Sequence, residues 1–258
     1  MTNAPHPLRT GMCSVTLREL PPLDVLDVAH AAGLGGIEWG GDKHVPPGDP
    51  DAAARVAAAC RDRGVRVTSY GSYFRAGPHG AAQFAPVLAA AVALGAPRVR
   101  IWAGDTGSAQ ATPAQRRAVV AAARGAAEQA AAAGVELAFE YHGNTLTDSA
   151  QWTVRLLEDI DHPAVRTYWQ PPVGFADADA LHGLELVLPW VSAVHVFSWW
   201  PLKERLPLAD RRSLWLQVFA RLRLTGRPFD LLLEFVAGND PARVAVDAAT
   251  LTRWRDDS

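Results

Sequence analysis

Short apolar runs that follow alanine-rich segments recur along the first half of the chain. Each alanine-rich segment leads through a glycine into a mostly apolar run, as in AAGLGGIEW, DRGVRVTSY, ALGAPRVRIW and AAAGVELAFE. The glycines are Gly33, Gly64, Gly95 and Gly134, separated by 31, 31 and 39 residues. Glycine just past a helix end adopts the left-handed conformation that terminates the helix. A continuous apolar run is typical of a strand buried on both faces. The pattern therefore predicts a repeated helix-glycine-strand unit.

The second half of the chain keeps the same alternation. The runs AVRTYW, VSAVHVF and FDLLLEFV each follow a helix-like segment, and GMCSVTLR supplies a strand near the start. Eight strands and eight helices in a chain of this length predict a (β/α)8 barrel, formed as a single domain over residues 1–258 with a flexible tail over residues 1–10. The alternative is an open doubly wound sheet. It is disfavoured because no glycine-rich phosphate turn follows the first strand and no change of composition marks a second domain.

The loops that follow the predicted strands are long, whereas those that precede them are short. In a barrel these long loops build the C-terminal face, where active sites lie. Most of the unusual side chains fall there: Glu38, Trp39, His44, Tyr73, Arg75, Trp102, Glu140, His142, Trp169, Gln170, His195, Trp199, Trp200, Lys203, Arg205 and Glu234.

Four of these residues predict a metal or acid-base site. Glu140, Gln170, His195 and Glu234 belong to the last four predicted strands, and neighbouring strands lie about 4.8 Å apart, so their side chains can converge. Carboxylate, carbonyl and imidazole ligands suit Mn²⁺, Mg²⁺ or Co²⁺ and accept Zn²⁺. Such an ion would hold the oxygens of a sugar and stabilise an enediolate. Glu140 and Glu234 would remove and return the proton.

The chain resembles a known family in the segments GIEWGGDKHVPPGD, SYGSYFRAG, VRIWAG, LAFEYHGNTLTDS, VRTYWQPP, VHVFSWW and LLLEFV. These segments are similar to the xylose isomerase-like barrels, which include sugar phosphate isomerases and epimerases. The resemblance covers nearly the whole chain. It implies one divalent ion, ligated from strands 5 to 8, and two glutamates that act as acid and base. Glu140 and Glu234 match these glutamates, and His142 matches a histidine often found two residues after the first.

Two positions depart from the family pattern. Gln170 stands where the family usually has an aspartate, and Phe197 stands at the usual ligand position of strand 7. His195 as a ligand is therefore our inference from the residues; a core histidine is the alternative. Glutamine in place of aspartate removes one negative charge, so the sequence leaves open whether Mn, Mg, Co or Zn is bound.

Aromatic and charged residues at the strand ends predict substrate contacts. Aromatic rings suit the C–H faces of a sugar or a flat apolar ligand. The alternatives are a hydrophobic plug, a dimer surface or, for the charged residues, solvated loops. We expect the substrate to contact Glu38, Trp39, His44, Tyr73, Arg75, Trp102, Trp169, Trp199, Lys203 and Arg205. We expect Trp152, Trp190, Trp215 and Trp254 to pack between helices instead.

Composition narrows the class of partner. The formal net charge of −2 supplies no electrostatic footprint for nucleic acid. No apolar run reaches the roughly 18 residues of a membrane span, and no nucleotide-binding motif is present. The two cysteines lack metal or disulfide spacing and favour a reducing compartment. We expect a cytoplasmic protein with a small-molecule substrate, either monomeric or a homo-oligomer.

These observations favour an isomerase or epimerase that acts on a sugar, keto-sugar or related polyol through an enediolate. Two alternatives stay open. One is a lyase or dehydratase on a carbonyl-containing metabolite, and the other is a non-catalytic binder with a decayed metal site. A DNA-repair nuclease of the same barrel type is disfavoured because its zinc cluster and basic face are missing.

Overall fold

Strands and helices alternate along the whole of the chain that the computed structural model describes, residues 7–78 and 80–257. Each strand pairs in parallel with the next, and β1 also pairs with β8, which closes the barrel. The prediction of a single (β/α)8 barrel is confirmed. The strands are β1 (Leu8–Cys13), β2 (Gly36–Gly40), β3 (Arg66–Arg75), β4 (Arg98–Trp102), β5 (Glu136–Phe139), β6 (Val165–Trp169), β7 (Val191–Val196) and β8 (Phe229–Leu233).

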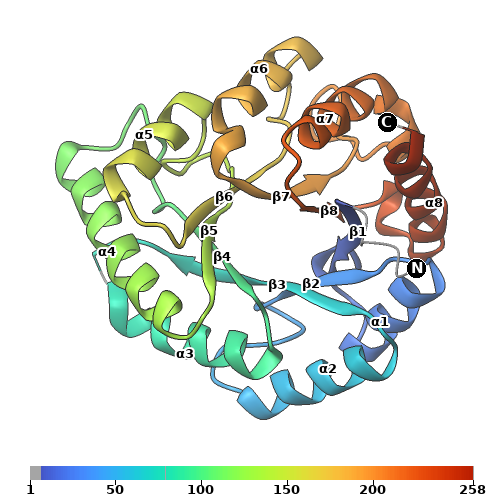
Figure 1. Cartoon of the computed structure of the whole chain (residues 1–258), viewed down its shortest axis with the longest axis horizontal. Helices are drawn as coiled ribbons and strands as arrows, with labels where there is room; N and C mark the ends of the chain where they lie inside the picture. Colours follow the sequence, from blue (N-terminus) through green and yellow to red (C-terminus); the bar gives the residue numbers. More distant parts are fainter. Residues whose placement is uncertain (1–6, 79, 258) are drawn as a thin grey trace.

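The helices form a ring outside the strands, as the view down the barrel shows (Figure 1). They are α1 (Pro22–Ala31), α2 (Pro50–Asp62), α3 (Gly80–Leu94), α4 (Pro113–Ala132), α5 (Ala150–Ile160), α6 (Asp177–Val187), α7 (Arg212–Leu224) and α8 (Pro241–Asp257). None of the helices in the described residues is both long and apolar enough to cross a membrane.

The predicted glycine stops are present in the backbone. Gly33, Gly64, Gly95 and Gly134 have φ angles of 73°, 65°, 71° and 71°. In this left-handed region a Cβ atom would clash with the backbone, which explains the use of glycine there. Each glycine turns the chain from the end of a helix into the next strand, so the short turns lie at the N-terminal end of the barrel and the long loops at the other end.

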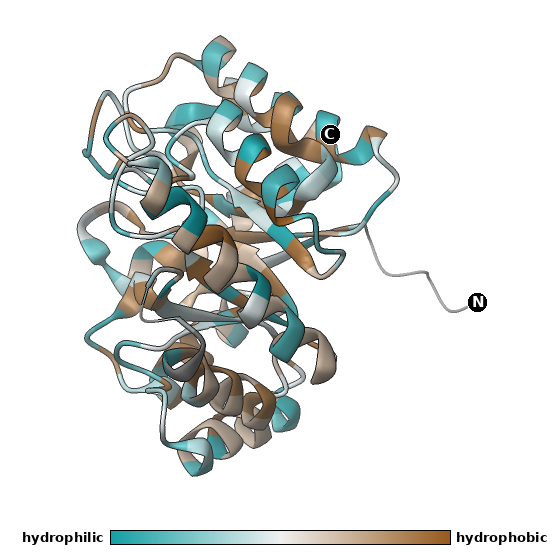
Figure 2. Ribbon diagram, turned by 90° about the vertical axis from the view of Figure 1, so that its left-hand side faces the viewer, coloured by the Kyte–Doolittle hydropathy of each residue, from teal (hydrophilic) through white to brown (hydrophobic). Residues whose placement is uncertain are grey.

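The strands bury both of their faces, in two separate hydrophobic clusters. The larger cluster fills the space between the strands and the helices, and hydrophobic stretches accordingly lie on the strands and along one side of many helical turns (Figure 2). The smaller cluster fills the inside of the barrel and comprises Cys13, Val15, Ala138, Tyr168, Ala193 and Leu232. Because side chains alternate along a strand, each residue faces either the helices or the barrel interior.

The N-terminal boundary differs from the prediction. We expected residues 1–10 to form a tail, but β1 begins at Leu8, which pairs with Phe229 of β8. These residues belong to the seam that closes the barrel, and closure leaves no exposed strand edge. Residues 1–6 lie outside the described part of the chain.

Candidate active site

A cavity of about 650 Å³ lies at the carboxyl ends of the strands. Its polar lining includes Arg100, Glu140, Gln170 and Glu234, and much of the remaining wall is aromatic. The cavity is the one that the long loops were predicted to build. The aromatic lining residues are Tyr73, Trp102, Tyr141, Phe175, Phe197, Trp199 and Phe235.

The two predicted catalytic glutamates both face this cavity. Glu140 directly follows β5, and its backbone N–H donates to the carbonyl of Ile101 at 2.9 Å. Glu234 directly follows β8, and its N–H donates to Val196 at 2.9 Å. Each bond extends the strand pairing by one residue, so rigid backbone holds both carboxylates. Their exposed fractions are only 4% and 6%, and each must therefore have a polar partner.

Arg100 is the partner of Glu140, and sequence analysis missed it. It lies on β4, is 4% exposed, and forms an ion pair with Glu140 through Nη1 and with Glu38 through Nε at 3.2 Å. Trp102 Nε1 also donates to Glu140. A signal for Arg100 was present: the run RVRIW puts two arginines two residues apart in an apolar strand, which places both on the inside of the barrel.

Glu38 lies beneath the cavity rather than in its lining. It is 2% exposed, and Ser69 donates to it at 2.8 Å. Burial alone would raise the pKa of Glu38, but the ion pair with Arg100 outweighs burial and holds that pKa well below its ordinary value. Glu38 was predicted as a substrate contact; in the structure it forms an ion pair with Arg100 of β4 and lies outside the cavity lining.

His195 occupies the interior of the barrel beside Glu234. Its side chain is fully buried, and Nδ1 lies 2.9 Å from Gln170 Oε1 and 3.5 Å from Glu234 Oε2. Nε2 lies 3.4 Å from Glu38 Oε1 and makes no hydrogen bond. The amide oxygen of Gln170 therefore hydrogen-bonds His195 directly and orients the imidazole ring.

His142 lies at the wall of the cavity, where its ring stacks on Trp102. The ring centroids are 4.8 Å apart and the planes differ by 17°. The guanidinium carbon of Arg75 lies 3.9 Å from the ring centroid of the same tryptophan, and the ring centroids of Tyr73 and Trp102 are 5.7 Å apart. Trp102 thus links His142 to Glu140 and holds both in place.

A second aromatic group lines the opposite part of the cavity. Trp199 contacts Phe197 and Phe235, with ring centroids 5.2 and 5.3 Å apart. Arg205 lies over Phe235 at 4.1 Å and also hydrogen-bonds Asn239. Lys203 lines the cavity, whereas Arg205 lies in a smaller adjoining cavity. Phe197 and Phe235 were not predicted as substrate contacts.

Three further predicted contacts, Trp39, Trp169 and His44, also lie outside the cavity lining. Trp39 and Trp169 have no exposed surface and pack in the cluster between strands and helices. Each follows an inward-facing residue, Glu38 or Tyr168, so each must face the helices. His44 is buried and contacts the hydroxyl of Ser14 at 2.8 Å and the carbonyl of Leu20 at 3.1 Å, which makes it a support of the first loop.

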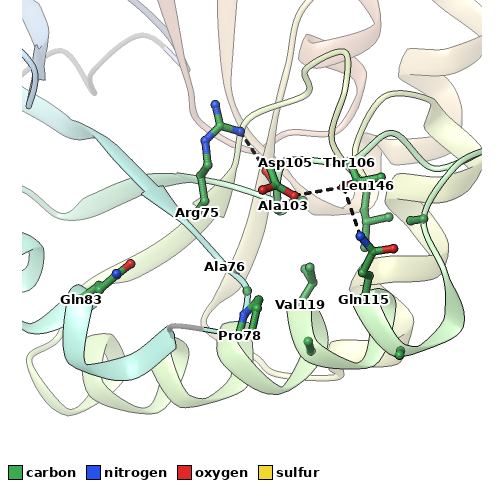
Figure 3. A pocket seen from close by; sticks show the side chains of 15 residues that line it. Arg75, Ala76, Pro78, Gln83, Ala103, Asp105, Thr106, Gln115, Val119 and Leu146 are labelled. Atoms are coloured by element: carbon green, nitrogen blue, oxygen red, sulfur yellow. Dashed lines mark hydrogen bonds between the residues drawn. The ribbon is translucent and has the colours of Figure 1, made fainter.

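Arg75 borders a separate cavity of about 570 Å³ beside α4 (Figure 3). There it donates to the carbonyl of Gly104 at 3.0 Å. The floor of this cavity is mostly apolar, with Ala103, Val119 and Leu146. Arg75 therefore contributes to the main site through Trp102 and not as part of its lining.

Comparison with known proteins agrees with this geometry. The family model described as xylose isomerase-like TIM barrel matches residues 26–245. The chain belongs to this family. Its matched part covers every strand except β1, and therefore all of the residues that were predicted as ligands or acid-base groups.

Individual relatives differ in the reaction that they catalyse. A 3-dehydroshikimate dehydratase of Bacillus anthracis is 23% identical over 205 residues, which cover 73% of this chain and 71% of that one. The structure of an L-ribulose 3-epimerase has a TM-score of 0.78 at 19% identity and covers 97% of this chain and 95% of its own. Family members thus include both epimerases and dehydratases.

A third relative bears on the metal. A xylose isomerase-like barrel from Mycobacterium smegmatis was solved in complex with magnesium; its TM-score is 0.70 at 16% identity, with 98% and 97% of the two chains covered. In the present chain Glu140 is engaged by Arg100 and Trp102, and Gln170 by His195. The donors that do converge are those of Cys13, His195 and Glu234, whose ligand atoms lie within 4.8 Å of one another.

Proposed function

We propose that this protein is an isomerase or epimerase that moves a proton at the carbon beside the carbonyl of a sugar, keto-sugar or related polyol. The observation that carries the proposal is that two buried carboxylates, Glu140 and Glu234, face one cavity from the ends of β5 and β8. Carboxylates fixed on either side of a substrate carbon can remove a proton from one face and return it to either face.

The partners of the two carboxylates suggest different roles. Glu234 has no arginine ion pair among the described residues and lies beside His195, so we assign it the removal of the proton. Glu140 is paired with Arg100 and can accept a hydrogen bond from a substrate hydroxyl; to return a proton to the opposite face of the carbon it must first take one from solvent. His142 lies beside Trp102 at the wall and would bind a substrate hydroxyl or carbonyl oxygen.

The intermediate of such a reaction carries negative charge on oxygen. Arg100 is a permanent cation in the lining of the cavity, and its charge would stabilise the enediolate as it forms. A divalent ion bound at the floor would add Lewis-acid polarisation of the carbonyl. Tyr73, Trp102 and Trp199 offer rings for the C–H faces of the substrate.

The test is solvent exchange. The protein is incubated in D₂O with a panel of ketoses and keto-sugars, and deuterium at the carbon beside the carbonyl is followed by mass spectrometry and NMR. We expect one substrate to gain a single deuteron at unchanged carbon skeleton. Glu234→Gln should lower the rate by at least about 100-fold, whereas Glu158→Gln, at an exposed position on α5, should not change it.

Exchange that survives in both Glu140→Gln and Glu234→Gln would refute the assignment of these residues. If no ketose exchanges but the same compounds bind saturably, the result favours the non-catalytic binder instead.

A dehydratase is the second candidate, because the relative named as a 3-dehydroshikimate dehydratase matches 73% of the chain. Its chemistry begins with the same proton removal and then expels a hydroxyl group. Lys203 and Arg18, both in the cavity lining, would suit the carboxylate of such a substrate. Incubation with 3-dehydroshikimate separates the two candidates: loss of one water from the substrate mass supports dehydration, and unchanged mass opposes it.

A further inference from the structure

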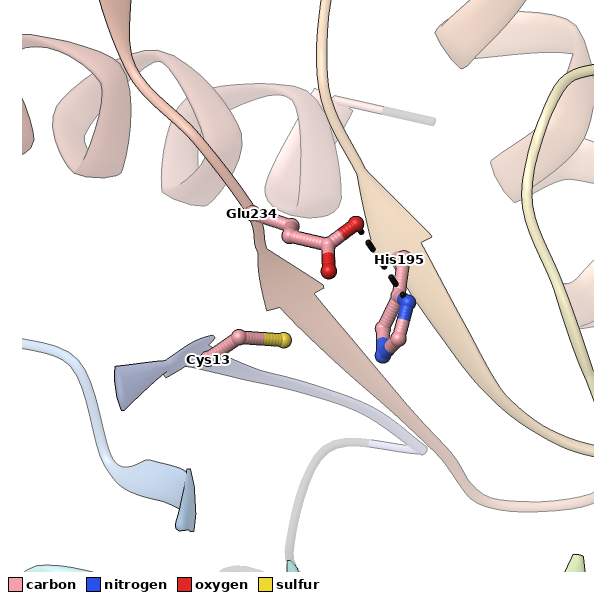
Figure 4. A group of neighbouring side chains, drawn as sticks. All are labelled: Cys13, His195 and Glu234. Carbon is pink, nitrogen blue, oxygen red and sulfur yellow. Dashed lines mark ion pairs between the residues drawn. The ribbon is translucent and has the colours of Figure 1, made fainter. Parts of the chain in front are cut away.

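Three possible metal ligands meet beneath the floor of the cavity. Cys13 comes from the end of β1, His195 from β7 and Glu234 from the residue after β8 (Figure 4). Their ligand atoms all lie within 4.8 Å of one another and all three residues are buried. Among the described residues, this is the group of histidine, cysteine and acidic side chains that is compact enough to hold an ion.

The orientation of His195 points to a ligand at Nε2. Nδ1 lies 2.9 Å from the amide oxygen of Gln170. An amide oxygen can only accept a hydrogen bond, so Nδ1 carries the N–H that donates to it. Nε2 then carries the lone pair; it makes no hydrogen bond although the side chain is fully buried, and it faces the carboxylate oxygen Oε1 of Glu38 at 3.4 Å, so two electron-rich atoms oppose each other there. Buried polar atoms without a partner are rare and costly. A metal-binding histidine commonly donates its other ring N–H to an oxygen, as His195 does here.

The charges around the cluster also call for a cation. Glu38, Glu140 and Glu234 are each at most 6% exposed, and Arg100 is the buried guanidinium that contacts the first two. With a neutral imidazole and thiol, these groups lack two positive charges. Arg18 and Lys203 lie at the exposed mouth of the cavity, where water screens their charge. A divalent ion would reduce this deficit by one charge, because its two positive charges are offset in part by the Cys13 thiolate that forms on binding.

We propose that Cys13, His195 and Glu234 form a divalent-metal site that prefers Zn²⁺ or Co²⁺ to Mg²⁺ or Mn²⁺. Thiolate, imidazole and carboxylate together form a borderline-soft ligand set. The Cys13 thiolate, at the end of β1, supplies the negative charge that is lost because Gln170 stands where the family usually has an aspartate. Glu140 is not a ligand, because Arg100 and Trp102 engage it. Binding converts the Cys13 thiol to a thiolate and releases its proton to solvent.

The test uses Co²⁺ as a spectroscopic probe, so it does not depend on the reaction proposed above. Metal-free protein is titrated with Co²⁺, and absorption is recorded in the near-ultraviolet, where thiolate-to-cobalt charge transfer appears. We expect one equivalent of Co²⁺ and a charge-transfer band in the wild type. Cys13→Ser should lose the band and bind Zn²⁺ at least about tenfold more weakly. Cys60→Ser is the matched control, because Cys60 is equally buried but lies in α2.

Two results would overturn the proposal: a wild type that binds neither Co²⁺ nor Zn²⁺, or a Cys13→Ser variant with unchanged band and affinity. Thermal unfolding checks that the variant is folded. X-ray absorption of the zinc-loaded wild type needs no variant: a Zn–S distance of about 2.3 Å supports the site, and a shell of nitrogen and oxygen alone at about 2.0–2.2 Å refutes it. Metal that remains in Cys13→Ser but is lost in Glu140→Gln would place the ion on the strand 5 to 8 ligands instead.

Discussion

Arg100 gives the candidate site its most specific residue-level feature. Its Nε contacts Glu38 and its Nη1 contacts Glu140, so one side chain holds two carboxylates at separate points. The planar guanidinium can do this because its donors are fixed relative to one another, whereas the ammonium of lysine is a single point charge. The shape of the group, and not only its charge, should matter for activity.

We therefore predict that Arg100→Lys lowers turnover in the exchange assay by about 100-fold or more, because loss of one preorganised donor at a developing oxyanion costs about 3 kcal/mol. Arg100→Met should be lower still. Lys43→Met, at an exposed position on the second loop, is the control for loss of a positive charge. Full activity in Arg100→Lys would show that the positive charge suffices and that the two-point contact is irrelevant.

Glu38 predicts a dependence of stability on pH. Because its pKa in the folded protein lies below its ordinary value of 4.5, the unfolded chain takes up the proton first as the pH falls. The stability that Glu38 contributes is therefore complete above about pH 4.5 and is lost as the pH falls below that value. We expect Glu38→Gln to lower the free energy of unfolding by about 3 kcal/mol at pH 7, since Arg100 loses a buried partner.

The difference in the free energy of unfolding between wild type and Glu38→Gln should then shrink by up to about 1.4 kcal/mol for each pH unit below 4.5. Urea unfolding of both proteins at a series of pH values between 7 and 3 measures it. A difference that stays constant across the series would mean that the pKa of Glu38 is the same in the folded and the unfolded protein.

At the scale of secondary structure, the strands and helices were predictable because their signals are local. Apolar runs, alanine-rich helices and left-handed glycines each act within a few residues. The facing of side chains was predictable in part: period two along β2 and β6 places Glu38 and Tyr168 inside, and hence Trp39 and Trp169 outside. Arg100 and Cys13 were missed because their partners come from other strands, and no pattern within one strand identifies those partners.

The glycines allow a test in which one substitution has opposite effects in two places. Gly64 ends α2 with a φ of +65°, and beyond Gly64 and its two neighbours no atom lies within 4 Å of an added Cβ, so Gly64→Ala brings only the local backbone strain. We expect a loss of about 1 kcal/mol. Gly125 lies inside α4 with equal space around it, and Gly125→Ala should gain about 0.5–1 kcal/mol from helix propensity.

Urea unfolding of both glycine variants gives the two values, and neither variant should alter exchange activity, since both positions lie outside the cavity. A loss of stability in Gly125→Ala would contradict the helix-propensity argument.

At the scale of the whole molecule, the two ends of the barrel have different tasks. The carboxyl ends of the strands hold the cavity, and the amino ends hold a cluster around Asp230 of β8. Asp230 is 2% exposed and pairs with Arg9 of β1 at 3.1 Å, Arg66 of β3 at 3.4 Å and Arg98 of β4 at 3.5 Å. The cluster joins the two strands that close the barrel to strands across its interior, so it should act on stability alone.

Asp230→Asn tests this division, because the substitution keeps the size of the side chain and removes its charge. Arg98, which is 8% exposed, then keeps Glu136 as its one ion-pair partner among the described residues, and we expect a loss of about 3 kcal/mol in the free energy of unfolding. Turnover of the folded enzyme should be unchanged, since Glu234 and the other cavity residues lie at the opposite end of the strands. Urea unfolding and the exchange assay measure the two effects separately.

The control is Glu185→Gln, which breaks an exposed pair with Arg221 and should change stability by less than about 0.5 kcal/mol. If Asp230→Asn lowered turnover at temperatures where it is fully folded, the two ends of the barrel would be coupled, and the separation of stability from catalysis would not hold.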